Sequence, residues 1–478
     1  MISDELGALI RGNFAHEPTK EQEMVICKWE EFLLSRNANS LFLLKGYAGT
    51  GKTSLVAALV KTLVQLKQSV MLLAPTGRAA KVFSSYAEAP AYTIHKRIYR
   101  QKSIIDMDSF QTNINLHKHT FFIVDEASMI SNDGLSGSMF GTGRLLDDLM
   151  QFVYSCEGCR LILVGDTAQL PPVGEEESPA LNRYILEGYD MDVTEVHLTE
   201  VVRQEQESGI LWNATHLRQL MQKELFYEFP RLRASGFPDV CVIHGDELID
   251  ALENSYQRCG TDQTIVVTRS NKRANIFNNG IRARILDYED ELSGNDLVMV
   301  AKNNYYWTEQ SGLAQQKEAK MPFVANGDVA IVRRFRNERQ FYGFRFADAT
   351  LQFPDYDNIE LDVTVLLDTL QSEAPALTRK QQEQLFNAVW EDYPEIRDKR
   401  ERMKRLRQDS YYNALQIKYA YAVTCHKAQG GQWQHVYIDQ GFISEELLTP
   451  DYFRWLYTAL TRATEKVFLV NWPNNQIE

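Results

Sequence analysis

The chain has 478 residues, of which 44% are hydrophobic and 24% are charged, and this composition excludes collagen-like, disordered and disulfide-scaffold proteins. Its 51 Lys and Arg residues against 64 Asp and Glu residues give a net charge of −13, so any nucleic-acid site has to be a local basic groove. No apolar stretch approaches the ~18–20 residues that span a bilayer, and the start lacks the pattern of a signal peptide. We therefore expect a cytoplasmic protein without membrane contact.

The predicted elements alternate strands with helices. A strand at 41–45 leads into a glycine-rich turn and a helix at 53–66. Further buried strands are predicted at 70–74, 121–125, 161–165, 264–268, 436–438 and 467–470. This alternation is typical of parallel sheets covered by helices on both faces. Because the strands fall before 166 and after 263, we expect an α/β fold with two sheet domains and a crevice between them.

Three segments interrupt the alternation. Residues 103–119 are polar and form either a β-hairpin or a surface loop. Residues 321–370 indicate a small barrel, with a turn at 326–328 and strands at 329–332, 341–346 and 359–367. Residues 379–409 follow as one long helical pattern, and seven basic residues face two acidic ones over 397–407. A solvated helix face is the simplest interpretation of this charge.

Cysteine is sparse in the chain. We expect the six cysteines to be reduced thiols, as in cytosolic proteins. One close pair, Cys156 and Cys159, has the spacing of zinc ligands, but neither a second pair nor a histidine doublet follows it. Because a structural zinc site needs four ligands, buried thiols are the simpler interpretation of this pair.

The glycine-rich turn at 46–53 matches the pattern GxxxxGK followed by Ser or Thr, between a predicted strand and a predicted helix. In such a loop the backbone N–H groups and the helix N-terminus surround nucleotide phosphates, the lysine reaches the β- and γ-phosphates, and the hydroxyl holds Mg²⁺. We therefore predict that ATP and Mg²⁺ bind here. The predicted ligands are Gly46, Ala48, Gly49, Thr50, Gly51, Lys52 and Thr53.

Two carboxylates follow the predicted strand at 121–125. Asp125 is placed to orient Mg²⁺ through a water molecule, and Glu126 to position and deprotonate the attacking water. A further strand at 161–165 ends in a polar turn, from which Gln169 is positioned to contact a γ-phosphate. The pattern therefore predicts nucleotide hydrolysis. A small-molecule kinase needs the phosphate loop alone and is the alternative of another class.

Residues 165–173 read GDTAQLPPV, and residues 124–128 read VDEAS. Together with the phosphate loop, they resemble motifs I, II and III of superfamily 1 helicases. The resemblance continues from residue 22 to residue 470, and the motif sequences are most similar to those of the RecD-like and Dda-like branch, superfamily 1B. It implies that Gln22 binds the adenine edge. It also implies that Gly430 belongs to the nucleotide site, and that Arg203 and Arg462 are arginine fingers from the far side of the cleft.

The same resemblance implies a set of DNA contacts. Residues 74–80, 93–95 and 421–433 resemble motifs Ia, Ib and V, and residues 268–271 resemble a weaker element of the second domain. In the family these elements contact the phosphates of single-stranded DNA. The implied DNA-binding residues are Pro75, Thr76, Gly77, Arg78, Thr93, His95, Asn271, Thr424, His426 and Lys427.

The resemblance also implies the domain plan and the activity. It assigns 1–200 to a first RecA-like domain with a hairpin at 103–119, and 201–320 with 411–478 to a second one. It assigns 321–410 to an inserted SH3-like barrel with the charged helix. The implied activity is ATP-driven movement 5′ to 3′ on single-stranded DNA, with unwinding of forked or tailed duplex by a monomer; no protein partner is implied. The alternative is a DNA-stimulated ATPase that remodels nucleic acid without unwinding.

Overall fold

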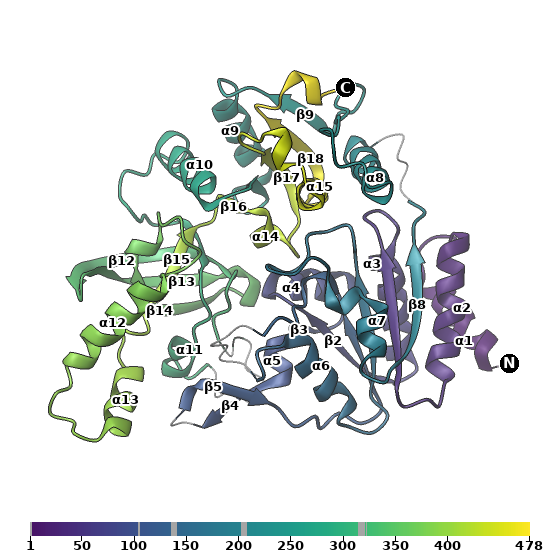
Figure 1. Ribbon diagram of the computed structural model, residues 1–478, viewed down its shortest axis with the longest axis horizontal. Helices are drawn as coiled ribbons and strands as arrows, with labels where there is room; N and C mark the ends of the chain where they lie inside the picture. The colour runs from purple at the N-terminus through teal and green to yellow at the C-terminus, as the bar shows by residue number, and fades with distance from the viewer. Residues whose placement is uncertain (1, 104–105, 135–140, 202–207, 314–320, 322) are drawn as a thin grey trace.

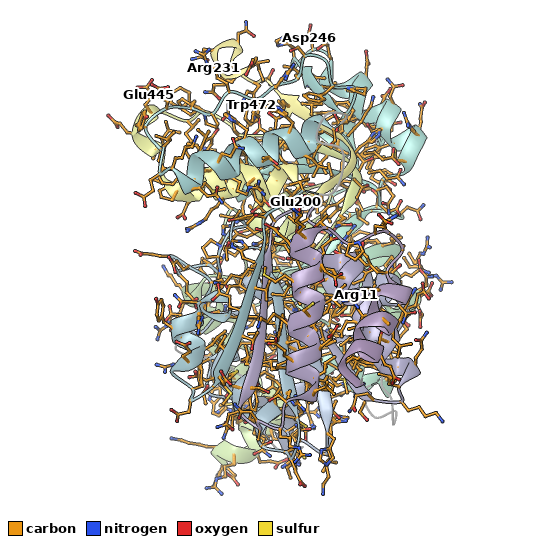
Figure 2. The ribbon with its side chains drawn as sticks, turned by 90° about the vertical axis from the view of Figure 1, so that its right-hand side faces the viewer. Arg11, Glu200, Arg231, Asp246, Glu445 and Trp472 are labelled. Carbon is orange, nitrogen blue, oxygen red and sulfur yellow. The ribbon has the colours of Figure 1, made fainter. Side chains whose placement is uncertain are left out.

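The computed structural model describes residues 2–103, 106–134, 141–201, 208–313, 321 and 323–478. Figure 1 shows three bodies: a first sheet domain at the N-terminal end of the chain, a second sheet domain above it, and a barrel beside both. Figure 2 shows Glu200 at the level where the first two bodies meet. None of the described helices combines the length and the apolar character that crossing a bilayer requires.

The first domain is built on a six-stranded parallel sheet. Its side chains alternate between the two faces. Leu41 and Leu43 pack with α6 in one apolar cluster, and Phe42 and Leu44 pack with α1, α2 and α3 in another. The strands in spatial order are β3 (Ala91–Thr93), β2 (Ser69–Ala74), β6 (Thr120–Val124), β7 (Arg160–Gly165), β1 (Ser40–Gly46) and β8 (Asp192–Leu198). The helices are α1 (Ile2–Asn13), α2 (Lys20–Leu34), α3 (Lys52–Gln65), α4 (Gly77–Ala87), α5 (Ile94–Ile98), α6 (Leu145–Tyr154) and α7 (Arg183–Glu187).

The second domain is built on a five-stranded sheet that is also parallel throughout. The two-sheet α/β prediction is therefore confirmed. In spatial order the strands are β16 (Ala422–Thr424), β10 (Thr264–Thr268), β17 (Trp433–Asp439), β18 (Ala463–Val470) and β9 (Val240–Ile243). The helices are α8 (Gly209–Gln222), α9 (Leu248–Cys259), α10 (Asn271–Arg284), α14 (Cys425–Ala428) and α15 (Pro450–Leu460).

A closed five-stranded barrel lies within the sequence of the second domain, which confirms the predicted inserted barrel. Its strands are β11 (Leu297–Val300), β12 (Val329–Phe341), β13 (Phe344–Phe353), β14 (Ile359–Leu366) and β15 (Leu415–Tyr419), and the short helix α11 (Tyr306–Gln310) precedes β12. Two of these strands, β11 and β15, lie outside the expected range 321–410. The expected strand at 341–346 is wrong, because Tyr342 and Gly343 adopt positive φ angles of 57° and 79° and form the turn between β12 and β13.

The charged segment after β14 forms two helices rather than the single helix expected over 379–409. They are α12 (Arg379–Glu391) and α13 (Lys399–Arg407). Pro394 lies in the connection, and its ring and missing N–H are incompatible with a continuous helix. The apolar residues Leu385, Val389 and Leu406 pack with Phe344 and Phe346 of the barrel. The insertion is therefore anchored to the barrel by an apolar face.

The interruption at 103–119 contains a real hairpin, but it begins earlier and ends earlier than expected. Strands β4 (Tyr99–Ser103) and β5 (Asp106–Thr112) pair antiparallel. The rest of the expected range is part of the first domain, since Asn115 is buried and donates its side-chain N–H groups to the carbonyls of Phe152 and Val153.

Candidate active site

The phosphate loop lies at the carboxyl end of β1 and leads directly into α3, as the sequence predicted. Gly49 and Gly51 have φ angles of 79° and 80°, which only glycine adopts at little cost. Thr50 is buried and its hydroxyl donates to the carbonyl of Tyr47 at 2.8 Å. The glycines thus permit the tight turn that exposes backbone N–H groups at the N-terminus of α3.

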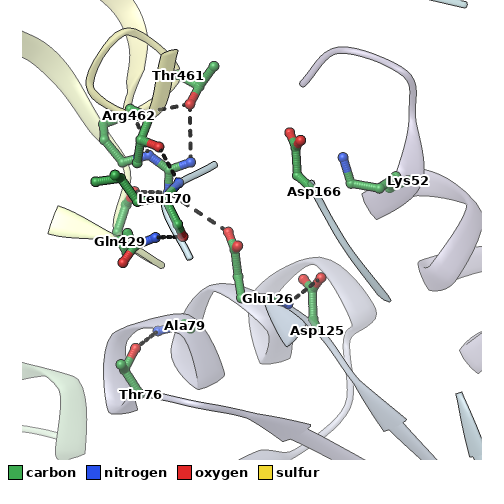
Figure 3. A network of polar contacts seen from close by, with 12 residues as sticks. Lys52, Thr76, Ala79, Asp125, Glu126, Asp166, Leu170, Gln429, Thr461 and Arg462 are labelled. Carbon is green, nitrogen blue, oxygen red and sulfur yellow. Dashed lines mark hydrogen bonds and ion pairs between the residues drawn. The ribbon is translucent and has the colours of Figure 1, made fainter. Parts of the chain in front are cut away.

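Lys52 is the first residue of α3. Its Nζ donates to the carbonyl of Tyr47 at 2.7 Å and also to that of Gly46. The ammonium group is therefore held inside the loop by two carbonyls. Figure 3 shows it beside Asp166, which follows β7.

Asp125 and Glu126 follow β6, and both line the same cavity as the loop. Asp125 accepts hydrogen bonds from the backbone N–H of Glu126 at 2.9 Å and from the hydroxyl of Tyr86. Glu126 has a φ of 52°, a left-handed conformation that costs energy for a residue with a Cβ. Burial raises the pKa of Asp125 and that of Glu126; Tyr86 opposes the first shift, and Arg462 opposes the second.

Arg462 enters the site from the second domain, at the turn between α15 and β18. Its Nη1 lies 3.8 Å from a carboxylate oxygen of Glu126, as Figure 3 shows. Its Nε donates to the carbonyl of Thr458 at 3.1 Å, and its Nη1 to that of Gly431 at 3.3 Å. The guanidinium is thus held in place by its own domain and faces the acid of the other.

One cavity of about 600 Å³ collects these groups between the two sheet domains. From the first domain it is lined by Gln22, Lys52, Thr53, Asp125, Glu126 and Gln169, among others, and from the second by Gln432 and Arg462. The side-chain oxygen of Gln169 is buried there without a hydrogen-bond partner. An unpaired buried acceptor is costly, so this oxygen fits a donor on a bound molecule or water.

Thr53 and Asp125 supply the oxygen atoms that Mg²⁺ prefers. They line one cavity with the phosphate loop, so the residues present fit a Mg²⁺ ion bound together with nucleotide phosphates.

Gln22 contacts the phosphate loop rather than standing apart from it. Its Nε2 donates to the carbonyl of Thr50 at 3.0 Å, and its Oε1 accepts from the backbone N–H of Thr19 at 3.0 Å. The side chain is buried and also lines the cavity. It therefore couples the start of α2 to the loop.

Tyr457 of α15 was not singled out from the sequence, yet it bridges the two domains. Its hydroxyl accepts from the backbone N–H of Ala48 at 2.8 Å and donates to a carboxylate oxygen of Asp166 at 2.7 Å. The next residue, Thr458, accepts from the backbone N–H of Leu170 at 2.9 Å. The sequence around Arg462 does not show which side chains of α15 cross the cleft.

The expected DNA residues of the first domain lie at the end of β2 and around α5. Pro75 follows β2, and Thr76 caps α4 by accepting from the backbone N–H of Ala79 at 3.2 Å. Gly77 approaches the barrel so closely that a Cβ there would lie 2.9 Å from Asp328. Arg78 reaches across to the second domain. Its Nη2 donates to the carbonyl of Gln432 at 3.2 Å, and its guanidinium lies 4.0 Å from the ring centre of Trp433.

Thr93 is the last residue of β3, and His95 lies in the short helix α5 that follows it. Thr93 caps that helix by accepting from the backbone N–H of Lys96 at 3.2 Å. Burial lowers the pKa of His95 to about 4, so this imidazole is neutral at pH 7. It can offer an N–H group to a phosphate but no charge.

The expected DNA residues of the second domain lie together. Asn271, Thr424, His426 and Lys427 line one cavity of about 460 Å³, together with Lys418. Burial lowers the pKa of Lys427 to about 8, and its ammonium donates to the side chain of Asn326 in the barrel. This cavity is a basic pocket in a chain with a net charge of −13.

One expected nucleotide residue lines a different cavity, and another lies outside the described residues. Gly430 lies against Thr76 and Ala79 of α4, and it lines the neighbouring cavity rather than the one that holds the phosphate loop. Arg203 lies outside the described residues.

Comparison with known proteins gives the family. A model of the AAA domain matches residues 30–226, which hold the phosphate loop, both acids and Gln169. A model of the UvrD-like helicase C-terminal domain matches residues 419–470, which hold Arg462 and the basic pocket residues Thr424, His426 and Lys427. Both models match segments that carry the helicase-like motifs, and the matches support a superfamily 1 helicase. Superfamily 1 helicases are ATP-hydrolysing enzymes, and the chain is an enzyme of this class.

The relatives of this superfamily 1 helicase are distant. The uncharacterized protein R530 of Acanthamoeba polyphaga mimivirus is 23% identical over 514 residues, which cover 94% of this chain and 98% of that protein. The ATP-dependent RecD2 DNA helicase of Deinococcus radiodurans is 32% identical over 134 residues, 28% of this chain and 16% of that protein.

Among solved structures, a Pif1 helicase from Bacteroides in complex with ADP-AlF3 and ssDNA is 15% identical, with a TM-score of 0.46 and coverage of 96% of this helicase and 94% of that chain. A Pif1 helicase from Candida albicans is 17% identical, with a TM-score of 0.38 and coverage of 96% of both chains.

Proposed function

We propose that the chain is an ATP-dependent DNA helicase that moves 5′ to 3′ on single-stranded DNA and unwinds duplex DNA. The observation that carries the proposal is the cavity of about 600 Å³ that both sheet domains line. Groups for binding and hydrolysing a nucleotide come from the first domain, and Arg462 comes from the second. Hydrolysis at such a site is coupled to the relative position of the two domains.

The chemistry follows from the side chains. Lys52 and the loop N–H groups neutralise and orient the phosphates, and Mg²⁺ held by Thr53 and Asp125 would offset phosphate charge. Glu126 takes a proton from the attacking water, since its burial raises the pKa and makes the carboxylate more basic. Arg462 offsets the negative charge that develops on the transferred phosphoryl group. Arg203 is proposed as the second arginine of this kind.

Coupling to DNA runs through the second domain. Tyr457 and Thr458 hydrogen-bond to the phosphate loop and to the segment after β7. Gln429, which follows α14, donates to the carbonyl of Leu170 at 2.7 Å. Because α14 carries His426 and Lys427 of the basic pocket, movement at the nucleotide is transmitted to side chains proposed to hold DNA phosphates.

The direction of movement rests on the RecD-like branch resemblance, which the RecD2 relative supports for 134 residues. Unwinding is tested with three duplexes that differ only in carrying a 5′ tail, a 3′ tail or no tail. We expect unwinding of the 5′-tailed duplex alone. Preference for the 3′ tail would contradict the proposed direction but not the helicase activity.

Steady-state ATP hydrolysis with and without single-stranded DNA tests the core of the proposal. We expect strong stimulation by DNA, and loss of at least about 10²-fold in Lys52→Ala, because the phosphates lose their cation. Lys61→Ala on the exposed face of α3 is the matched control and keeps its activity. Hydrolysis that DNA does not change would overturn the helicase function.

A change in the hairpin of β4 and β5 tests whether the chain unwinds duplex DNA or only moves along one strand. We propose that the hairpin acts as the wedge at the fork. The structure limits the deletion, because Asn115 belongs to the core, so only residues 101–110 are exchanged for Asn-Gly between the paired Arg100 and Gln111. The expected variant keeps DNA-stimulated ATP hydrolysis and loses unwinding. Equal loss of both activities would contradict the wedge role of the hairpin.

A further inference from the structure

A cluster of three potential metal ligands lies in the second domain, outside the nucleotide cavity. Its members are Cys259 at the end of α9, His435 in β17 and Glu465 in β18, and their ligand atoms all lie within 4.8 Å of one another. It is the one such group among the residues that the structure describes. The pair Cys156 and Cys159, whose spacing suggested zinc, is not part of it.

The strand pairing is irregular at the cluster. Trp433 pairs with Ala463 and His435 pairs with Lys466, so β18 carries one residue more than β17 between these pairs. Glu465 is in this extra stretch. Bulges of this kind re-aim side chains and are frequent next to functional sites.

The hydrogen bonds around His435 fix its tautomer. Tyr437 donates its only hydroxyl proton to the carbonyl of Ala251 at 2.6 Å. Ser255, whose Oγ lies 2.6 Å from the Tyr437 hydroxyl, is therefore the donor in that contact. Since the proton of Ser255 is used there, its oxygen accepts from Nδ1 of His435 at 2.8 Å. Nδ1 thus carries the proton, and Nε2 carries a lone pair.

Nε2 of His435 is buried and has no hydrogen-bond partner, although only 3% of the residue is exposed. The neighbouring members of the cluster are a thiol and a carboxylate. A carboxylate and an imidazole lone pair are both acceptors, so an ion that accepts electron pairs suits the space between them. Arg258 lies beside the cluster, with its Nη2 3.7 Å from a carboxylate oxygen of Glu465, and Lys466 also contributes positive charge.

We propose that Cys259, His435 and Glu465 bind Zn²⁺, with water as the fourth ligand. Sulfur, imidazole nitrogen and carboxylate oxygen are the ligand types of zinc, and the hydrogen bond from Nδ1 to Ser255 orients the imidazole as zinc-bound histidines require. Tetrahedral coordination at about 2.0–2.3 Å brings ligand atoms to about 3.5 Å from one another. Cys259 and Glu465 are partly exposed, so their side chains can close this difference by rotation. The ion would tie the end of α9 to β17 and β18.

Cobalt spectroscopy of the full chain tests the site, since Co²⁺ replaces Zn²⁺ and reports its ligands. The chelator-treated protein is titrated with Co²⁺ and then with Zn²⁺. We expect one equivalent of Co²⁺ with a sulfur-to-cobalt charge-transfer band and the strong visible bands of a tetrahedral ion, and their loss when Zn²⁺ is added. Spectra without a thiolate band, or no binding, would overturn the proposal.

Variants assign the ligands. Cys259→Ser is expected to remove the thiolate band and to weaken metal binding about 100-fold. Cys241→Ser, which changes a half-buried thiol on β9 of the same sheet, is the matched control and keeps the band. Glu465→Gln changes a partly exposed side chain, so it folds even if Cys259→Ser does not, and it is expected to shift the visible bands and weaken binding. A band that survives in Cys259→Ser, or an unchanged spectrum in Glu465→Gln, contradicts this ligand set.

Discussion

At the scale of single residues, the hydroxyl of Tyr457 contacts two groups that belong to the other domain. It satisfies a half-buried backbone N–H of the phosphate loop and a buried carboxylate that follows β7. No other side chain named in the site touches both segments. The phenol therefore links the two domains beside the phosphate loop.

Tyr457→Phe leaves the N–H of Ala48 and the carboxylate of Asp166 without this partner. An unsatisfied buried group costs about 1–3 kcal/mol, so we expect DNA-stimulated ATP hydrolysis to fall about tenfold or more. The matched control is Tyr452→Phe, which removes a buried hydroxyl of the same helix whose bond to Gln440 stays inside the second domain. Steady-state rates at saturating DNA compare the two, and equal rates would contradict a bridging role.

Residue patterns predicted which side chains supply the chemistry of the site, but not the contacts that these side chains make between the two domains. The loop, Asp125 and Glu126 follow buried strands, and their order in the sequence places them at one edge of a sheet. Tyr457 and the contact of Arg78 with Trp433 depend on two domains meeting, which no local pattern contains. The position of Gly430 against α4 depends on the same meeting.

At the scale of elements, a buried ion pair joins α10 to the base of the barrel. The guanidinium of Arg282 donates to both carboxylate oxygens of Asp296 at 2.9 Å, and the side chains are only 6% and 0% exposed. Asp296 also accepts from the hydroxyl of Tyr421 at 3.0 Å and from the backbone N–H of Ser293 at 2.8 Å. The pair lies where the chain leaves the second sheet domain for β11.

Arg282→Ala leaves the charge of Asp296 buried and unpaired. We expect the free energy of unfolding to fall by about 3–5 kcal/mol, measured from the urea transition. Arg379→Ala breaks an ion pair on α12 in which the arginine is 94% exposed, and it is expected to cost less than about 0.5 kcal/mol. A similar loss in both variants would show that burial does not decide the energy of the pair.

Asp328 makes the barrel sensitive to pH. Burial raises its pKa to about 7, although it accepts hydrogen bonds from the backbone N–H of Ala325 and from Tyr356. Between about pH 4 and pH 7 the folded chain binds a proton that the unfolded chain does not, so stability falls as pH rises through this window. Asp328→Asn is expected to remove this pH dependence, which changes the free energy of unfolding by at most about 4 kcal/mol across the window. Urea unfolding at several pH values measures it, with the exposed Asp362→Asn as control; an unchanged slope in Asp328→Asn would contradict the assignment.

Elements with strong patterns were predicted and weak ones were not. The strand at 264–268 is apolar throughout its centre and matches β10 residue for residue. β8 mixes Asp, Thr, Glu and His with its apolar residues without a regular alternation, so it does not stand out from a loop. β11 and β15 are short, and only their tertiary pairing in the barrel defines them. The predicted strand at 341–346 failed because aromatic content outweighed the turn signal of Gly343.

At the scale of the whole molecule, the chain carries a net charge of −13 but presents cations in the pocket of Lys418 and Lys427. Binding of single-stranded DNA is therefore expected to weaken steeply with salt. The slope of the logarithm of the association constant against the logarithm of the salt concentration becomes steeper by about 0.7 for each neutralised phosphate. Lys427→Gln is expected to reduce the slope by about that amount, and Lys380→Gln on the exposed face of α12 to leave it unchanged. Fluorescence anisotropy with oligo-dT at several salt concentrations measures the slopes. Identical slopes in both variants would place the phosphates elsewhere.

The order of strands in the second sheet constrains how the protein is made. β9 appears first during synthesis, but its neighbour in the sheet is β18, and β17 lies between β18 and β10. While the ribosome is still translating the barrel, the two strands that separate β10 from β9 in the sheet, β17 and β18, have not yet been made. Strands β16, β10 and β17 can pair once β17 has emerged, but β9 has no neighbour until β18 follows. A nascent chain stalled before residue 463 therefore carries an incomplete sheet that favours aggregation or chaperone binding.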